Sequence, residues 1–133
     1  MPIEAVDHIN IRTANVEGMS QWYTDILEMP SGARPNFGFG GAWLYLGDTA
    51  LIHLVEVDHL PEDTDPKLEH FALRASGLAD FLDRLQSHNV AYRIAEVPSL
   101  PIVQVNIHDP DGNHIHVDFS AEEYQALNGS IPA

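Results

Sequence analysis

The stretch DHINIRT at residues 7–13 recurs as EHFALRA at residues 69–75, and this repeat decides the fold. Both copies run in the same order through an acidic residue, a histidine, an apolar residue, a small or polar residue, a second apolar residue and an arginine. Self-similarity of this kind is typical of a chain built from repeated structural units. The sequence therefore predicts two copies of one unit in tandem, with His8 and His70 at equivalent positions.

The residues that follow each copy also match. Residues 15–27 and 77–88 carry apolar side chains at spacings of three and four, which predicts a helix in each, with Asn15 and either Ser76 or Gly77 as N-caps. Three short runs of strand character follow each helix. The expected strands are residues 5–12, 31–37, 42–46 and 50–57 in the first copy, and 68–75, 92–97, 103–108 and 113–119 in the second.

These elements predict an α+β fold of two tandem βαβββ modules whose sheets close around a metal site. We expect a single domain over residues 1–133, with module one at about 4–58 and module two at about 67–119. A polar, proline-flanked linker at residues 60–65 joins the modules. A C-terminal helix at about 121–128 follows Ser120, which resembles a capping box with Glu123.

Four histidines occupy repeat-equivalent strand positions. Side chains alternate between the two faces of a strand, so each of these histidines is expected to project from the face opposite the one that a helix covers. The last strands of the copies read LIHL at 51–54 and HIHV at 114–117. Imidazole suits Zn²⁺, Ni²⁺, Cu²⁺ and Fe²⁺, and the chain has no cysteine to offer. The sequence thus predicts a metal site whose ligands are His8, His53, His70 and His116.

The remaining histidines, His59, His88, His108 and His114, are expected to be solvated, although His114 shares the strand face of His116. Other side chains are candidates for substrate binding because parity groups them on common strand faces: Trp43, Tyr45, Gln104, Asn106 and Arg12. Surface salt bridging is the favoured role for Arg12, and core or dimer packing is an equal alternative for Trp43. Glycines surround apolar rings at residues 36–41, which predicts a mobile entrance loop.

The composition excludes several classes of partner. The chain has 133 residues, and 20 acidic against 6 basic side chains give a formal net charge of −14. Such a chain repels phosphate backbones, so nucleic acid and anionic membranes are poor partners. The sequence shows no secretory start and no apolar run long enough for a membrane span. We expect a cytoplasmic protein that binds a small molecule.

The chain resembles the vicinal-oxygen-chelate superfamily, which includes glyoxalase I, extradiol dioxygenases and bleomycin-resistance proteins. The resemblance rests on residues 7–11, WYTDILEM at 22–29, residues 69–73 and DPDGN at 109–113. It implies a metal bound by the first and last strands of each module, at positions that match the four predicted histidines. It also implies a homodimer, often with each site shared between the subunits.

The resemblance departs from glyoxalase I at two positions. Glutamates that serve proton transfer typically stand there where this chain has His53 and His116, which argues against that particular activity. Neutral imidazoles leave a bound metal more positive, and an uncommitted imidazole can still take a proton. His53 and His116 are therefore the predicted catalytic residues, each as a ligand, a base or both.

The predicted function is that of a divalent-metal-dependent enzyme that binds a small oxygen-bearing organic substrate by chelation. Its metal is Fe, Zn, Ni or Mn, and dioxygenase, isomerase or lyase, and group-transfer chemistry all fit. The alternative is a metal-free protein that binds a small molecule or antibiotic, as bleomycin-resistance proteins do. A dimerising scaffold without a metal is a third reading.

Overall fold

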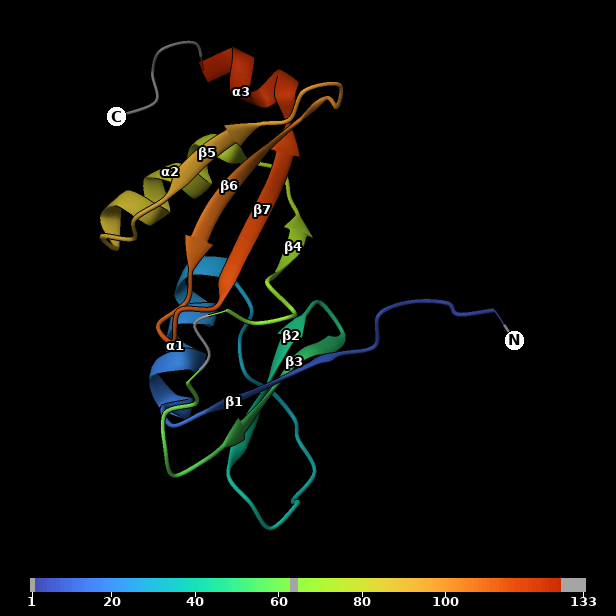
Figure 1. Cartoon of the computed structure of the whole chain (residues 1–133), viewed down its shortest axis with the longest axis vertical. Coiled ribbons are helices and arrows are strands. Elements are labelled where there is room, and N and C mark those ends of the chain that lie inside the picture. The colour runs from blue at the N-terminus through green and yellow to red at the C-terminus, as the bar shows by residue number, and fades with distance from the viewer. Residues whose placement is uncertain (1, 63–64, 128–133) are drawn as a thin grey trace. The chain divides into compact units, whose positions relative to one another are not determined.

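The structure is a computed structural model that describes residues 2–62 and 65–127 (Figure 1). The chain divides into two compact units, Met1–Thr64 and Asp65–Ala133. Residues 63 and 64 of the expected linker, and residue 128 at the end of the expected C-terminal helix, lie outside the described residues. The assignment of both modules to a single domain stays a prediction.

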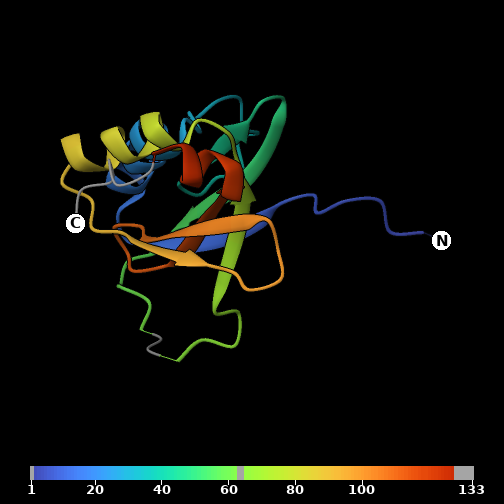
Figure 2. The same cartoon turned by 90° about the horizontal axis from the view of Figure 1, so that it is seen from above.

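The first unit contains β1 (Ile9–Thr13), α1 (Val16–Leu27), β2 (Gly41–Leu46) and β3 (Thr49–Glu56). Its sheet has the order β1-β3-β2 within the described residues, with β1 parallel and β2 antiparallel to the central β3. Asn15 caps α1 as predicted, because its side-chain oxygen accepts the N–H of Gly18 at 3.0 Å. Residues 2–7 run away from β1 as an extended segment (Figures 1 and 2).

The prediction of a strand at residues 31–37 is wrong. Ser31 makes an isolated bridge to Leu44, and the segment then leaves the sheet. Pro35 has no N–H for a ladder hydrogen bond, and Gly38 adopts a φ of 80°, which lies outside the strand region. The first unit is therefore βαββ with a long loop between α1 and β2.

The second unit has the complete βαβββ order. Its elements are β4 (His70–Arg74), α2 (Leu78–Ser87), β5 (Arg93–Glu96), β6 (Ile102–His108), β7 (His114–Ser120) and a C-terminal α3 (Ala121–Leu127). The sheet order is β4-β7-β6-β5, and β4 runs parallel to β7 just as β1 runs parallel to β3. Figure 2 shows α2 lying along one side of this sheet.

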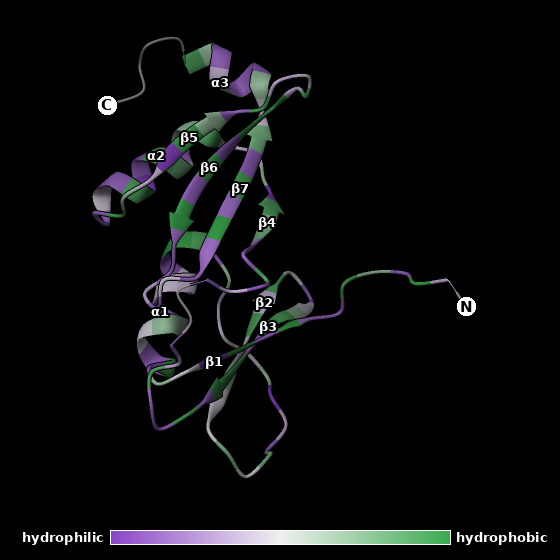
Figure 3. Cartoon of the chain, viewed as in Figure 1, coloured by the Kyte–Doolittle hydropathy of each residue, from purple (hydrophilic) through white to green (hydrophobic). Residues whose placement is uncertain are grey.

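Each helix covers an apolar face of its own sheet. Apolar and polar residues alternate along β6 and β7 (Figure 3), and the aromatic rings of Phe81 in α2 and Phe119 in β7 lie 5.5 Å apart. The buried side chains of the first unit include Met19, Tyr23, Ile26, Leu44, Ile52 and Leu54; those of the second include Leu78, Leu82, Leu85, Val105, Ile107, Ile115 and Val117. Burial of each large apolar side chain contributes ~1.5–3 kcal/mol. The opposite face of each sheet is left for the polar side chains, including the histidines.

Glu123 has a larger role than the expected capping box gives it. Its backbone N–H does donate to the Ser120 hydroxyl at 3.2 Å. Its carboxylate, however, accepts the N–H groups of Gly77 at 2.9 Å and Leu78 at 3.0 Å. A side chain of α3 thus caps the N-terminus of α2, where backbone donors have no partner within the helix.

The architecture confirms the predicted α+β class with two tandem modules. Within residues 2–62 and 65–127, no helix has both the length and the apolar character that crossing a membrane requires.

Candidate metal centre

The first unit brings His8 and His53 together. His53 lies in the central strand β3, and His8 immediately precedes β1, which pairs with β3. The two imidazole rings stack with centroids 3.9 Å apart and planes inclined by 7°. Trp43, opposite His53 in β2, stacks on it at 4.2 Å with planes inclined by 12°. His53 is therefore held between a second histidine and an indole.

In the part of the chain that the structure describes, each ring of this pair has one nitrogen without a hydrogen bond. The Nδ1 of His8 lies 2.7 Å from a carboxylate oxygen of Asp7, and the Nε2 of His53 lies 3.0 Å from the carbonyl oxygen of Ala50. Each oxygen is an acceptor, so the ring nitrogen facing it carries the proton. Lone pairs in two parallel rings cannot converge on one ion. Ligation by both rings therefore requires one of them to turn, and His8, whose side chain is 41% exposed and outside the strand, is the freer of the two.

The environment of His53 disfavours protonation of its imidazole. Burial, followed by electrostatic repulsion between the two imidazoles of His53 and His8 when protonated, lowers the pKa of His53 below its ordinary value of 6.5. The carbonyl of Ala50 and the carboxylate of Asp7 act in the opposite direction, and Arg34 adds to the lowering. A neutral imidazole is the form that binds a metal or accepts a proton.

The second unit brings His70 and His116 together, with ring centroids 4.6 Å apart and planes inclined by 43°. The Nδ1 of His116 donates to Asp118 at 2.6 Å, in a pair whose side chains are only 9% and 21% exposed. The Nδ1 of His70 donates to Glu69 at 2.7 Å. Histidines that bind metals usually donate their other N–H to a carboxylate or carbonyl in this manner. The Nε2 atoms of both rings are left as the candidate ligands.

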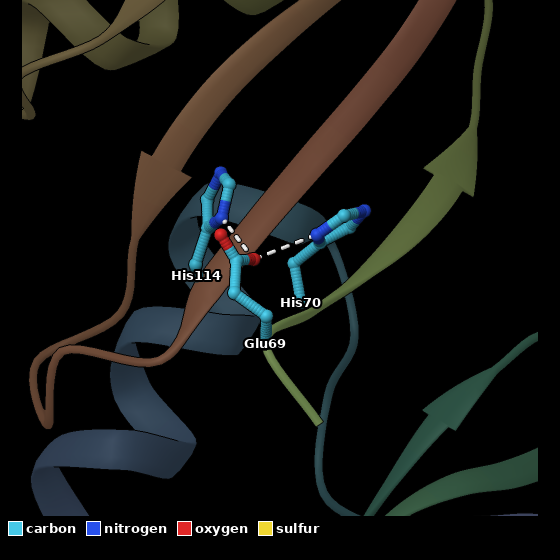
Figure 4. Close-up of side chains that lie close together, drawn as sticks. All are labelled: Glu69, His70 and His114. Carbon is cyan, nitrogen blue, oxygen red and sulfur yellow. Dashed lines mark hydrogen bonds and ion pairs between the residues drawn. The ribbon is translucent and has the colours of Figure 1, made fainter. Parts of the chain in front are cut away.

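A third histidine joins this unit's cluster (Figure 4). The Nδ1 of His114 donates to the same Glu69 oxygen at 2.8 Å, and donor atoms of Glu69, His70 and His114 all lie within 4.8 Å of one another. The hydrogen bonds from His114 and His70 lower the pKa of the Glu69 carboxyl group. These three groups form a second possible metal-binding set.

The expectation that His114 is solvated is wrong. Its side chain is 20% exposed, and its Nε2 lies 2.8 Å from the amide oxygen of Asn106. The residue lies in β7 directly opposite His70 in β4, which explains why both reach Glu69. The other three histidines of that group, His59, His88 and His108, are exposed as expected.

The predicted substrate-binding residues divide into three groups. Trp43 stacks on the predicted ligand His53, whereas Asn106 contacts His114, which was not among the predicted ligands. The Tyr45 hydroxyl donates to the carbonyl of Ala33 and so holds the loop before β2. Gln104 and Arg12 lie in β6 and β1, and neither makes a ring contact or side-chain hydrogen bond with the histidines of the described residues. Their assignment to a substrate stays a prediction.

The carboxylates that orient the histidines were missed from the sequence. Asp7 and Glu69 precede His8 and His70 in both copies of the repeat, and Asp118 shares a strand face with His116. A repeated acidic residue beside a repeated histidine is a signal that was present in the alignment of the two copies. The residue spacing alone does not predict that each carboxylate forms a hydrogen bond with the histidine beside it.

The fold and the histidine pairs define a class of paired βαβββ-type proteins with candidate metal ligands on the sheet faces. The sequence profile of the Glyoxalase/Bleomycin resistance protein/Dioxygenase superfamily matches residues 5–117, and the chain belongs to this family. No curated protein matches the chain.

Several solved structures share the fold. A glyoxalase family protein from Bacillus anthracis is 18% identical with a TM-score of 0.75, over 90% of this chain and 98% of that one. A glyoxylase/bleomycin resistance protein/dioxygenase domain from Frankia sp. EAN1pec is 21% identical with a TM-score of 0.73, over 90% and 93%. A lactoylglutathione lyase from Agrobacterium tumefaciens is 15% identical with a TM-score of 0.67, over 90% and 96%. At these identities the likeness shows the fold alone.

Proposed function

We propose that this protein is a divalent-metal-dependent enzyme that binds a small oxygen-bearing organic substrate by chelation. The observation that carries the proposal is the hydrogen bonding of the imidazole rings: each of the four predicted ligands has one nitrogen bonded to a carboxylate or carbonyl, while its other nitrogen has no hydrogen bond within the described residues. The proposed ligands are His8, His53, His70 and His116. Fe, Zn, Ni and Mn are the candidate metals.

A divalent metal supplies Lewis-acid polarisation of a substrate oxygen when it is bound. The chain's own contribution follows from its neutral ligands, since imidazoles leave the positive charge of the ion uncompensated and favour an anionic substrate oxygen. Asp118 fixes the proton of His116 on Nδ1, which commits that buried ring to ligation through Nε2. Dioxygenase, isomerase or lyase, and group-transfer reactions all need this stabilisation of negative charge.

His53 is the better of the two proposed bases. Its Nε2 proton is held toward Ala50, so Nδ1 is the atom that either binds the metal or, in a state in which it does not hold the metal, accepts a proton from a substrate. The lowered pKa of His53 favours the unprotonated form of that atom. His116 is engaged with a carboxylate in a buried position and suits the role of ligand.

A metal-free binding protein is the second candidate. It is supported by the net charge of −14 together with the exposed rings of Phe37 and Phe39, which suit a cationic aromatic drug. In either case we propose a cytoplasmic homodimer that acts on a small molecule.

Alanine substitutions at His116 and His114 separate the two ligand sets. Protein without an affinity tag is reconstituted with Fe²⁺ or Zn²⁺ under anaerobic conditions, and bound metal is measured by mass spectrometry. We expect His116→Ala to lose the metal while His114→Ala and the exposed control His59→Ala keep it. Loss in His114→Ala alone would assign the ion to Glu69, His70 and His114 instead. A wild-type chain that binds no metal would support the metal-free candidate.

A further inference from the structure

A row of aromatic rings in the first unit extends from the predicted ligand pair into the loop before β2. Beyond His53 and Trp43, the ring of Phe37 lies 6.1 Å from Trp43, and the ring of Phe39 stacks on Phe37 at 5.3 Å with planes inclined by 17°. Phe37 is 46% exposed and Phe39 is 51% exposed. Large rings left in solvent beside a candidate catalytic histidine offer a stacking surface for a flat ligand.

Arg34 stands at the outer part of this row. Its guanidinium carbon lies 5.0 Å from the ring centroid of Phe37 and 5.3 Å from that of Phe39. Its Nη2 donates to the carbonyl of Phe39 at 3.0 Å. In the described part of the chain Arg34 makes no ion pair, and its buried Nε has no hydrogen-bond partner. Because no carboxylate of the described residues pairs with this guanidinium, its positive charge favours an anionic ligand, which would approach the Nη groups since Nε is buried.

The loop that carries Arg34 is fixed by hydrogen bonds. The hydroxyl of Tyr45 donates to Ala33, and the N–H of Gly38 donates to the side chain of Asn36 at 3.2 Å. Arg34 lies 5.0 Å from the ring of Phe37, which lies 6.1 Å from Trp43, and Trp43 stacks on His53 at 4.2 Å. The positive charge, the rings and the proposed base therefore belong to one preformed face of the first unit.

We propose that the substrate is a planar aromatic carboxylate with an adjacent oxygen substituent, its carboxylate bound by Arg34 and its ring stacked against Phe37 and Trp43. A carboxylate is favoured over a phosphate because a single guanidinium matches one negative charge, and the net charge of −14 opposes a dianion more strongly. Arg34 is here a specificity residue. The role of the adjacent oxygen rests on the proposed metal-dependent function, whereas the role of Arg34 does not.

The test is calorimetric titration of the metal-loaded full chain with salicylate, a planar carboxylate that carries a neighbouring hydroxyl group. 2-Hydroxybenzyl alcohol keeps the ring but lacks the charge, and cyclohexanecarboxylate keeps the charge but lacks the flat ring. Arg34→Gln is compared with the wild type and with Arg93→Gln, which removes an exposed charge from β5 in the other unit.

We expect Arg34→Gln to weaken salicylate binding by about tenfold or more while changing the affinity for the alcohol by less than about twofold. Arg93→Gln should bind salicylate as the wild type does, and the wild type should bind cyclohexanecarboxylate more weakly than salicylate. The proposal is overturned if wild-type protein shows no saturable binding of salicylate, or if Arg34→Gln binds it unchanged. Equal losses for salicylate and the alcohol would also overturn it, because they would show that Arg34 only supports the loop.

Repeating the titrations after removal of metal with a chelator separates this inference from the proposed function. Arg34-dependent binding of salicylate by a chain that never takes up metal would uphold the inference and contradict the metal-dependent function. Normal metal content in Arg34→Gln with unchanged salicylate affinity would contradict the inference and leave the metal-dependent function standing.

Discussion

Replacing Asp118 with asparagine should weaken metal binding without removing any ligand. Asp118 accepts the Nδ1 proton of His116 at 2.6 Å, and the two side chains are 21% and 9% exposed. Solvent screens such a pair weakly, so its geometry and charge are expected to matter. The carboxylate keeps the His116 proton on Nδ1 and leaves Nε2 as the metal-binding atom. It also makes that imidazole a stronger electron donor.

The magnitude follows from the kind of contact that is lost. Removing an outer carboxylate partner of a histidine ligand typically costs ~10–100-fold in metal affinity, or ~1.4–2.7 kcal/mol. An asparagine oxygen can still accept the proton but lacks the charge, so Asp118→Asn should fall near the lower value. Asp118→Ala has no acceptor and should approach the upper value.

Metal affinity is measured by competition with a chromophoric chelator at pH 7 under anaerobic conditions. Asp83→Asn is the matched control, since it removes one exposed charge from α2 in the same unit and tests the effect of net charge alone. An Asp118→Asn affinity equal to that of Asp83→Asn would refute the role of this carboxylate. It would also weaken the assignment of His116 as a ligand.

Three further predictions concern titration, stability and metal removal. In metal-free protein, NMR titration should place the pKa of His53 below 6.5. Because the unfolded chain then binds this proton more readily than the folded chain does, the contribution of His53 to the free energy of unfolding is lost as the pH falls through about 6.5. A midpoint at or above 6.5 would contradict the stacked, desolvated environment. Glu123→Ala should lower the free energy of unfolding by ~1 kcal/mol through loss of the cap on α2, with Glu122→Ala nearly neutral in denaturant titrations; equal effects would argue against the cap. Chelator treatment should lower the melting temperature of metal-loaded protein in proportion to the metal removed, and an unchanged temperature would argue that the ion is not bound by the native fold.

The sequence allowed the fold to be predicted because two independent signals agree. The repeat of residues 7–13 at 69–75 sets the module, and the alternation of apolar residues around His53 and His116 sets which face the helices cover. Side-chain parity follows from backbone geometry alone, so it carries over directly from sequence to structure. The histidine pairs within each unit were predictable for this reason.

Other features depend on contacts that a local pattern does not specify. The segment at residues 31–37 has apolar and small residues suited to a strand, but Pro35 has no N–H to donate to a neighbouring strand. The segment instead forms the loop before β2 that carries Arg34. The pairing of His114 with Glu69 depends on the register of β4 against β7, which places His114 opposite His70. Glu123 was expected to close its own helix cap, yet α2 offers it two unpaired N–H groups. Register and long-range capping are tertiary properties.

The proposed function depends on a catalytic metal bound by the histidines of this chain. The most direct test is an anaerobic equilibrium titration of tag-free wild-type protein with Fe²⁺ and Zn²⁺, in parallel with a variant that carries alanine at His8, His53, His70 and His116. We expect saturable binding of about one ion per chain by the wild type and none by the variant. Equal binding by both proteins, or no saturable binding by the wild type, would contradict it.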